Sequence, residues 1–312
     1  MIVKRLLTSI PLLFVMSVLV FSMIALVPGD AATTIAGGGN ASPQVVQQIR
    51  EELNLDEPFF VQYATWLKSA VQFDFGESLY SQRPVADELL ERLPVTLSLA
   101  LAVFAIVIPL ALVLGIVGGL RPGGLGDRGM MFGTSVVVSM PPFWIGMVLI
   151  SVFSVSLGWL PPYGYTAFAD DPAGWARSII LPAVALAAAG VAMLSRQLRA
   201  GLADTMQSAY VRTAWAKGGD TRRVVVGHAL KNSAIPAATV LGLMVGSILG
   251  STVIVEQIFN IPGIGSYMIA AVSSKDVPVI QATALLFVVA HIIANLMVDI
   301  SYGYLNPKVR AA

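Results

Sequence analysis

Six long apolar runs without an aspartate, glutamate, lysine or arginine set the strongest limit on what this chain of 312 residues can fold into. They cover Ser9–Val27, Val95–Leu120, Met130–Gly158, Ile179–Leu194, Ala237–Val255 and Val279–Val298. An α-helix rises about 1.5 Å per residue, so about 20 apolar residues cross the hydrocarbon core of a bilayer. The runs therefore predict an all-α integral membrane protein with six transmembrane helices.

The composition supports this class and argues against others. Charged residues make up 12 % of the chain and hydrophobic residues 56 %, whereas an ordinary soluble domain is about 25 % charged. A net charge of +1 gives no sign of a nucleic-acid partner. Because the chain has no cysteine, it has no disulfide framework and no thiolate nucleophile. The expected surroundings are membrane lipid.

The distribution of charge predicts the orientation of the spans. If the amino terminus lies inside, 13 of the 19 basic residues fall in inside segments and 14 of the 18 acidic residues fall outside. Basic loops favour the cytoplasmic side, so we expect both termini there. The first run follows Lys4 and Arg5 and is longer than the roughly 7–15 apolar residues of a signal peptide. We expect it to remain as an anchor helix.

These spans divide the chain into expected parts. Residues 1–30 would form the anchor helix, 31–94 an extracytoplasmic helical segment, and 95–312 a core of five transmembrane helices with a cytoplasmic loop over 196–236. Two shorter connections, Arg121–Gly129 and Trp159–Arg177, are expected to be a plain inside turn and an ordered outside loop.

The external segment carries helix-like stretches and an aromatic stripe. Ser42-Pro43 is a typical helix start, and helix-like spacing continues to Lys68. Two interpretations of the stripe remain open: a packing face within a small external layer, or a lid or docking surface for an external partner. The candidate residues are Asp56, Glu57, Phe59, Phe60, Tyr63 and Trp66.

The long inside loop predicts a firm projection. Asp204–Lys217 can form a helix that ends at Gly218-Gly219, since glycine is the usual residue just past a helix end. Asp220 is then a good N-cap for a second helix over Thr221–Lys231, and Pro236 would lie at the mouth of the fifth span. A narrow projection of this kind suits docking into a groove on another protein. A folded connector without a partner is the alternative.

The fifth span carries small residues at four-residue spacing. They are Gly242, Gly246 and Gly250, with Ser247 and Ser251 beside them. Such a stripe lets helices approach closely, and Gly246, Ser247, Gly250 and Ser251 are also candidates for lining a translocation path. The broken stretch Asn260–Gly265 is expected to form a short re-entrant or interfacial turn.

Motifs for catalysis are absent from the sequence. There is no Gly-x4-Gly-Lys-Ser/Thr phosphate loop, no Gly-x-Ser-x-Gly elbow and no His-Glu-x-x-His zinc site. We therefore expect no catalytic, cofactor-binding or metal-binding residue and no enzymatic activity in this chain. Within the six runs His291 is the only ionisable group of the kind that secondary transporters place near the midplane. This argues against proton or sodium coupling.

The order of several short motifs resembles a known family. These are Val3-Lys4-Arg5-Leu6-Leu7, Leu26-Val27-Pro28-Gly29-Asp30, Asp74-Phe75-Gly76-Glu77-Ser78, Leu93-Pro94-Val95-Thr96-Leu97, Pro142-Phe143-Trp144-Ile145-Gly146, Tyr210-Val211-Arg212-Thr213-Ala214, Glu256-Gln257-Ile258-Phe259 and Pro262-Gly263-Ile264-Gly265. Over nearly its whole length the chain resembles the B-type permease subunit of dipeptide and oligopeptide ATP-binding-cassette (ABC) importers, a family that also includes nickel and glutathione permeases.

The resemblance implies a type I ABC importer permease fold in a bacterial inner membrane. It implies a heterodimer with a C-type permease, two cytoplasmic ATPase subunits that bind ATP and magnesium, and an extracytoplasmic peptide-binding protein. The residues that would contact the ATPases are Arg212, Thr213, Ala214, Lys217, Gly218, Gly219 and Asp220. The general importer motif has Glu-Ala-Ala where this chain has Arg212-Thr213-Ala214.

Two alternatives to peptide import stay open. The same machine could import a nickel chelate, glutathione or another small solute, because the binding protein chiefly chooses the cargo. A more remote alternative is a membrane channel or scaffold that acts alone.

Overall fold

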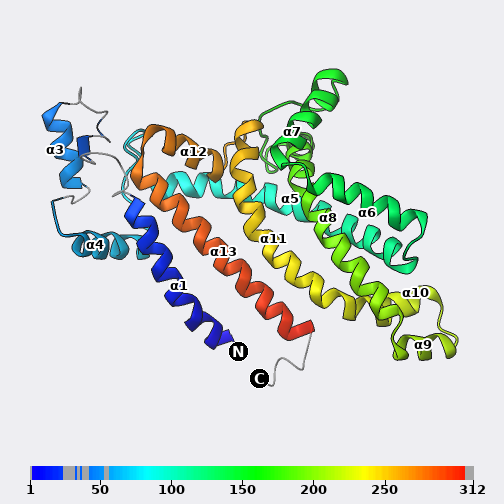
Figure 1. Ribbon diagram of the computed structural model, residues 1–312. Helices are drawn as coiled ribbons and strands as arrows, with labels where there is room; N and C mark the ends of the chain where they lie inside the picture. Colours follow the sequence, from blue (N-terminus) through cyan, green and yellow to red (C-terminus); the bar gives the residue numbers. More distant parts are fainter. Residues whose placement is uncertain (1, 24–31, 34–35, 37–41, 53–55, 306–312) are drawn as a thin grey trace. The chain divides into compact units, whose positions relative to one another are not determined.

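A computed structural model describes residues 2–23, 32–33, 36, 42–52 and 56–305 (Figure 1). Within those residues the chain is helical, with no strand and one isolated bridge between Glu77 and Pro84. The α-helices are α1 (Ile2–Ser22), α3 (Pro43–Glu52), α4 (Phe59–Val71), α5 (Val85–Leu120), α6 (Leu125–Val138), α7 (Pro142–Leu149), α8 (Pro172–Met206), α9 (Ala209–Ala216), α10 (Thr221–Val224), α11 (Leu230–Ile258), α12 (Ile264–Ser274) and α13 (Val277–Leu305). Two π-helical segments, η2 (Ile150–Ser156) and η3 (Val225–Ala229), follow α7 and α10.

Among the described residues, four helices are long and apolar enough to cross a membrane, or five spans if the bent pair of α6 and α7–η2 counts as one. The four helices are α5, α8, Pro236–Ile258 of α11 and Val277–Met297 of α13, and they contain the second, fourth and fifth predicted runs and all but the last residue of the sixth. The first predicted run begins in α1, whose apolar part Ile10–Ser22 is shorter, and residues 24–27 of that run lie outside the described residues.

The third predicted run is divided between two helical segments rather than forming one continuous helix. α6 and the α7–η2 pair meet at a bend of 100°. The break coincides with Pro141 and Pro142: Pro141 is extended, with ψ 143°, and Pro142 begins α7. A proline disfavours helical geometry in the residue before it and has no N–H to donate, which explains the break.

The chain forms two compact units. The first unit comprises Thr96–Ile261 and the chain from Ile293, and the second comprises Ile2–Val95 and Pro262–Ile292. The boundary at Val95 matches the expected start of the core, whereas residues 262–292 associate with the amino-terminal part. The predicted domain division as a whole stays a prediction.

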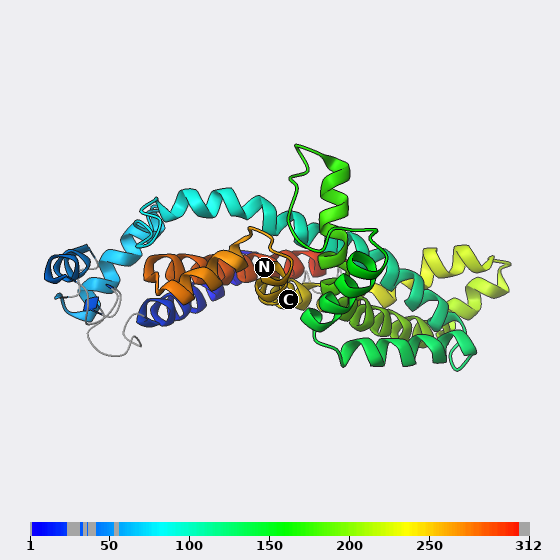
Figure 2. The ribbon, with the colours of Figure 1, turned by 90° about the horizontal axis from the view of Figure 1, so that it is seen from above.

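In the first unit, α8 lies against α6, α7 and α11. The approach of α5 to α8 is close because Gly115 has no side chain: a Cβ there would lie 2.6 Å from the Cβ of Leu198. Figures 1 and 2 show α9 and α10 beyond the ends of α8 and α11.

In the second unit, α5, α12 and α13 share a small apolar core. Its buried residues are Val85, Leu89, Ile264, Ala271, Val279 and Ala282. The break expected over Asn260–Gly265 is shorter than predicted, because the eleven-residue helix α12, which was not predicted, begins within it at Ile264. Asn260 in the break has a positive φ of 50°, a conformation that asparagine adopts more readily than most residues.

Candidate functional site

The inside projection begins with a break that the sequence analysis missed. A single helix over Asp204–Lys217 was predicted, but α8 ends at Met206 and α9 begins at Ala209. Ser208 between them is extended, with ψ 151°, and its hydroxyl donates to the Thr205 carbonyl at 2.6 Å. Its side chain makes no cap hydrogen bond to α9, but its carbonyl accepts from the Arg212 N–H at 3.1 Å, the first bond of the new helix.

The predicted glycine corner at the end of α9 is confirmed. The N–H of Gly218 donates to the Trp215 carbonyl at 2.9 Å and that of Gly219 to the Ala214 carbonyl at 3.2 Å, the two bonds of a Schellman motif. Gly218 has a φ of +80°, which favours glycine. Position 219 has no room for a side chain, because a Cβ on Gly219 would lie 3.0 Å from both the Ala214 carbonyl oxygen and a Val224 methyl.

The predicted N-cap at Asp220 is also confirmed, but the helix that follows does not end at Lys231. The Asp220 carboxylate accepts from the Arg223 N–H at 3.3 Å, and α10 continues through η3 into α11. Pro236 lies inside α11, and the stretch that is long and apolar enough to span begins there, as predicted. The projection is therefore joined directly to a spanning helix.

The inner face of α9 is anchored in a buried cluster formed with the ends of α5 and α8 and with α10 and η3. Val211 is fully buried there. The other buried members are Leu202, Val224, Val225 and Ala229, and the partly buried Ile116, Leu120, Met206 and Ala214 pack against them. Burial of a large aliphatic side chain stabilises by about 1.5–3 kcal/mol, so this cluster fixes the projection to the spans.

The predicted coupling residues divide between two faces. Arg212, Thr213 and Lys217 are exposed, whereas Ala214 is half-buried against the cluster. Tyr210 and Trp215 are exposed by 44 % and 39 %, and they were absent from the predicted set. Large aromatic side chains in an inside loop of otherwise small residues were the signal that could have found them.

A group of side-chain hydrogen bonds joins α6 to α8 close to this projection, and we call it the α6–α8 clamp. The Arg199 guanidinium donates to both carboxylate oxygens of Asp127, at 2.8 and 2.6 Å, and the Gly123 N–H donates to the same carboxylate at 2.7 Å. One turn earlier on α8, Arg196 donates to the hydroxyls of Thr134 and Ser135 at 2.9 and 2.8 Å.

The α6–α8 clamp was missed because the connection Arg121–Gly129 was interpreted as a plain turn. In the structure its second half begins α6, and Asp127 is only 4 % exposed. The signal was present: Asp127 is one of the few acidic residues in the inside segments, which are otherwise basic.

The candidate path residues lie on α11. Ser247 and Gly250 are exposed, and Gly246 and Ser251 are half-buried. Nothing lies within 4 Å of a Cβ built on Gly250. Leu243 and Ile254, exposed by 61 % and 50 %, continue the same face, so this chain leaves that side of α11 uncovered among the described residues.

The candidate lid residues on α4 pack against α1. Phe21 of α1 lies 5.4–5.7 Å, ring centre to ring centre, from Phe59, Tyr63 and Trp66, and the Tyr63 and Ser17 hydroxyls are 2.8 Å apart. Phe60 is turned away and is 81 % exposed. Asp56 and Glu57 are exposed before α4, and Asp56 pairs with Arg50 at 3.4 Å. The packing interpretation fits Tyr63, and Phe60 is left for an external contact.

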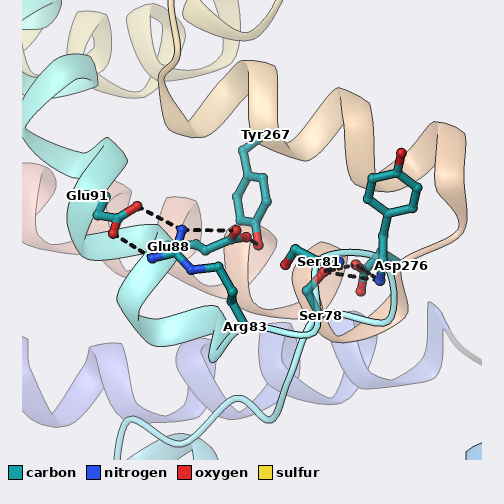
Figure 3. Close-up of polar contacts among 8 residues, drawn as sticks. Ser78, Ser81, Arg83, Glu88, Glu91, Tyr267 and Asp276 are labelled. Carbon is teal, nitrogen blue, oxygen red and sulfur yellow. Dashed lines mark hydrogen bonds and ion pairs between the residues drawn. The ribbon is translucent and has the colours of Figure 1, made fainter.

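A polar network joins the start of α5 and the chain before it to α12 and to the turn before α13 (Figure 3). Glu88, 4 % exposed, accepts from the Tyr267 hydroxyl and pairs with Arg83 at 3.7 Å. The Ser78 hydroxyl donates to Asp276 at 2.6 Å. Burial and the hydrogen bond to Glu88 raise the pKa of the Tyr267 phenol, so it remains a donor.

No group of three or more histidine, cysteine or acidic side chains that could hold a metal ion occurs in the part of the chain that the structure describes.

The chain belongs to the family of binding-protein-dependent transport system inner membrane components. That family matches residues 107–311, and the family of the amino-terminal part of these components matches residues 1–100. The chain is therefore a membrane-spanning permease subunit of a binding-protein-dependent ABC importer, as the motifs predicted.

Two relatives illustrate the similarity. A putative peptide transport system permease protein of Brucella abortus is 40 % identical over 310 residues, or 99 % of this chain and 98 % of that protein. The glutathione transport system permease protein GsiC of Escherichia coli is 42 % identical over 309 residues, again 99 % of this chain and 98 % of that protein.

Proposed function

We propose that this subunit imports short peptides and that α9 is the element through which ATPase subunits drive it. The observation that carries the proposal is the continuity of α10, η3 and α11, which joins the projection to a spanning helix without a flexible link. The peptide cargo is supported by the name of the Brucella abortus relative.

In this proposal the complex contains a second, C-type permease, two cytoplasmic ATPases and an external peptide-binding protein. ATP and magnesium bind to the ATPases, and this chain holds no cofactor and performs no catalysis. ATP binding closes the ATPases and moves α9 of each permease, and the path opens outward. Hydrolysis and product release reset the complex, which makes a two-state alternating-access cycle.

The rigidity of the projection supports this role. A displacement of α9 reaches α11 through the buried cluster around Val211 and reaches α6 through the α6–α8 clamp. The exposed residues Arg212, Thr213 and Lys217, with Tyr210 and Trp215, form the face that an ATPase groove would hold. Ala214 supports that face from behind, and Gly218, Gly219 and Asp220 shape its end.

The proposed location is a bacterial inner membrane, with both termini cytoplasmic and α9 on the cytoplasmic side. The uncovered side of α11 with Ser247 and Gly250 would then face the path or the C-type partner. Phe60 would face the binding protein.

Uptake by cells with and without this chain tests the cargo. The panel contains labelled dipeptides, longer peptides, glutathione and chelated nickel. Loss of peptide uptake alone supports the proposal. Loss of glutathione or nickel uptake alone would mean that the subunit works by the same mechanism but imports that cargo instead of peptides.

Purification in mild detergent tests the assembly. The proposal requires a second permease and two ATPase chains to copurify, with ATP hydrolysis stimulated by the loaded binding protein. A chain that purifies alone and conducts solute without ATP would instead be a channel.

A further inference from the structure

A preformed cavity of about 580 Å³ lies in the first unit between the loop 158–166 and the first turns of α8. Its lining includes Trp159, Tyr163, Tyr165, Thr166, Arg177 and Ser178. Sites for small molecules are typically about 300–1,000 Å³ and combine apolar walls with a few polar groups, which this lining does. None of the coupling, path or lid residues described above belongs to it.

The loop that forms the cavity wall is fixed at several points. The Gly164 N–H donates to the Phe259 carbonyl at 2.8 Å, and the Tyr165 and Ser98 hydroxyls are 3.0 Å apart. At the other end of the loop, the Trp159 N–H donates to a carbonyl of η2 at 2.9 Å. A wall held in this way needs no ordering when a ligand enters, which lowers the cost of binding.

Arg177 is the only charged residue among those that line the cavity. Its side chain is exposed, and within the described part of the chain it has no ion pair or hydrogen bond. The nearby Asp171 carboxylate accepts from the Ala173 N–H at 3.0 Å and caps α8. A guanidinium favours planar, two-pronged binding of a carboxylate.

We propose that this cavity receives the carboxylate end of a short peptide after it leaves the binding protein. Arg177 binds the carboxylate and is a specificity-determining residue, and the Trp159 and Tyr163 rings contact the rest of the peptide. The inference rests on the proposed peptide import and on the external placement of Trp159–Arg177.

An acidic side chain of the binding protein is the competing occupant for Arg177. A cavity of this volume favours the peptide, because protein surfaces that dock on one another bury broad areas of about 800 Å² on each partner rather than filling one small cavity. The two occupants predict different effects of changing Arg177. If the peptide binds there, the change affects which cargo is imported; if the binding protein binds there, the change affects docking of the binding protein.

The test uses the whole reconstituted transporter in proteoliposomes. Import of a labelled tripeptide is compared with import of its carboxyl-terminal amide, each at a concentration that saturates the binding protein, with loading checked by fluorescence. ATP hydrolysis stimulated by the loaded binding protein is measured in parallel. The variants are Arg177→Gln and Arg177→Lys, and Lys68→Gln on α4 is the control that removes another exposed positive charge.

We expect Arg177→Gln to slow import of the free acid by about tenfold, the effect of losing one charge-assisted contact. Import of the amide and stimulated ATP hydrolysis stay unchanged, Arg177→Lys falls between, and Lys68→Gln matches the unaltered protein. Equal losses for acid and amide with loss of stimulated hydrolysis would assign Arg177 to the binding protein and overturn the inference. Unchanged import of both peptides would overturn it too. Absence of peptide import by the unaltered transporter would instead refute the proposed function, and the inference with it.

Discussion

The guanidinium of Arg199 and the carboxylate of Asp127 form a two-pronged ion pair at 2.8 and 2.6 Å, with Asp127 only 4 % exposed. Arg199 lies two turns before the end of α8 at Met206, where the projection begins. The pair therefore joins the foot of the projection to α6. A two-pronged, part-buried pair of this kind holds a geometry more firmly than a fully exposed one, because its two hydrogen bonds fix the orientation of both side chains.

Asp127→Asn is expected to weaken coupling. The variant leaves the part-buried Arg199 guanidinium without its anionic partner, so α6 would no longer follow α8 as one body. Basal ATP hydrolysis should persist while stimulation by the loaded binding protein falls several-fold. The measurement is the ratio of stimulated to basal hydrolysis in the reconstituted complex.

Two further variants separate loss of coupling from loss of fold. Asp204→Asn removes an exposed acidic residue from the same region of α8 and should leave the ratio unchanged. The double variant Asp127→Arg with Arg199→Asp should recover part of the stimulation lost in the single variants. If it recovers none, and the Asp127→Asn complex assembles normally, the pair is structural only.

The corner after α9 predicts different outcomes for its two glycines. Gly218→Ala adds a Cβ where no atom lies within 4 Å, at a left-handed φ that costs about 1 kcal/mol. Gly219→Val forces its side chain against the Ala214 carbonyl oxygen at 3.0 Å. We expect Gly218→Ala to transport almost normally and Gly219→Val to insert in the membrane without transporting. Uptake and membrane content measured together check this, and full uptake by Gly219→Val would contradict it.

The sequence predicts most of the spans because long uncharged runs have few other solutions in a bilayer. It also locates the corner at Gly218 and the cap at Asp220, since both depend on local backbone chemistry. The predicted spans are shorter than helices α8 and α11. An apolar run ends near the first charged residue, whereas a helix continues as long as its backbone hydrogen bonds can form. Helix α11 illustrates this, because it begins at Leu230, before the span that starts at Pro236.

The contacts missed from sequence are those between distant segments. Nothing local in the sequence pairs Asp127 with Arg199, which are 72 positions apart. The same holds for the cavity at Arg177, whose wall depends on Gly164 bonding to the end of α11. Ala214 was placed on the docking face because its small size suggested a narrow surface, but the helical register turns it partly toward Leu202 and Val224.

The buried carboxylate of Glu256 predicts a stability effect of Thr96. Glu256 is fully buried, and the Thr96 hydroxyl donates to it at 2.8 Å. Thr96→Val removes that donor while keeping the shape, which is expected to cost about 1–3 kcal/mol. The measurement is thermal unfolding in detergent. Thr252→Val is the matched control, because its hydroxyl is equally buried but donates only to the Leu249 carbonyl of its own helix. Equal melting temperatures for the two variants would contradict this role for Thr96.

The proposed orientation predicts which introduced cysteines an impermeant thiol reagent can reach, and the absence of native cysteine makes the measurement clean. Phe60→Cys on α4 should react in intact cells, since that position is 81 % exposed and is assigned to the outside. Lys217→Cys at the end of α9 should react only after the membrane is opened. Ala111→Cys, fully buried in α5, should react in neither state and reports on intact folding. Labelling of Lys217→Cys but not Phe60→Cys in intact cells would reverse the topology and remove α9 from the side where ATPases bind.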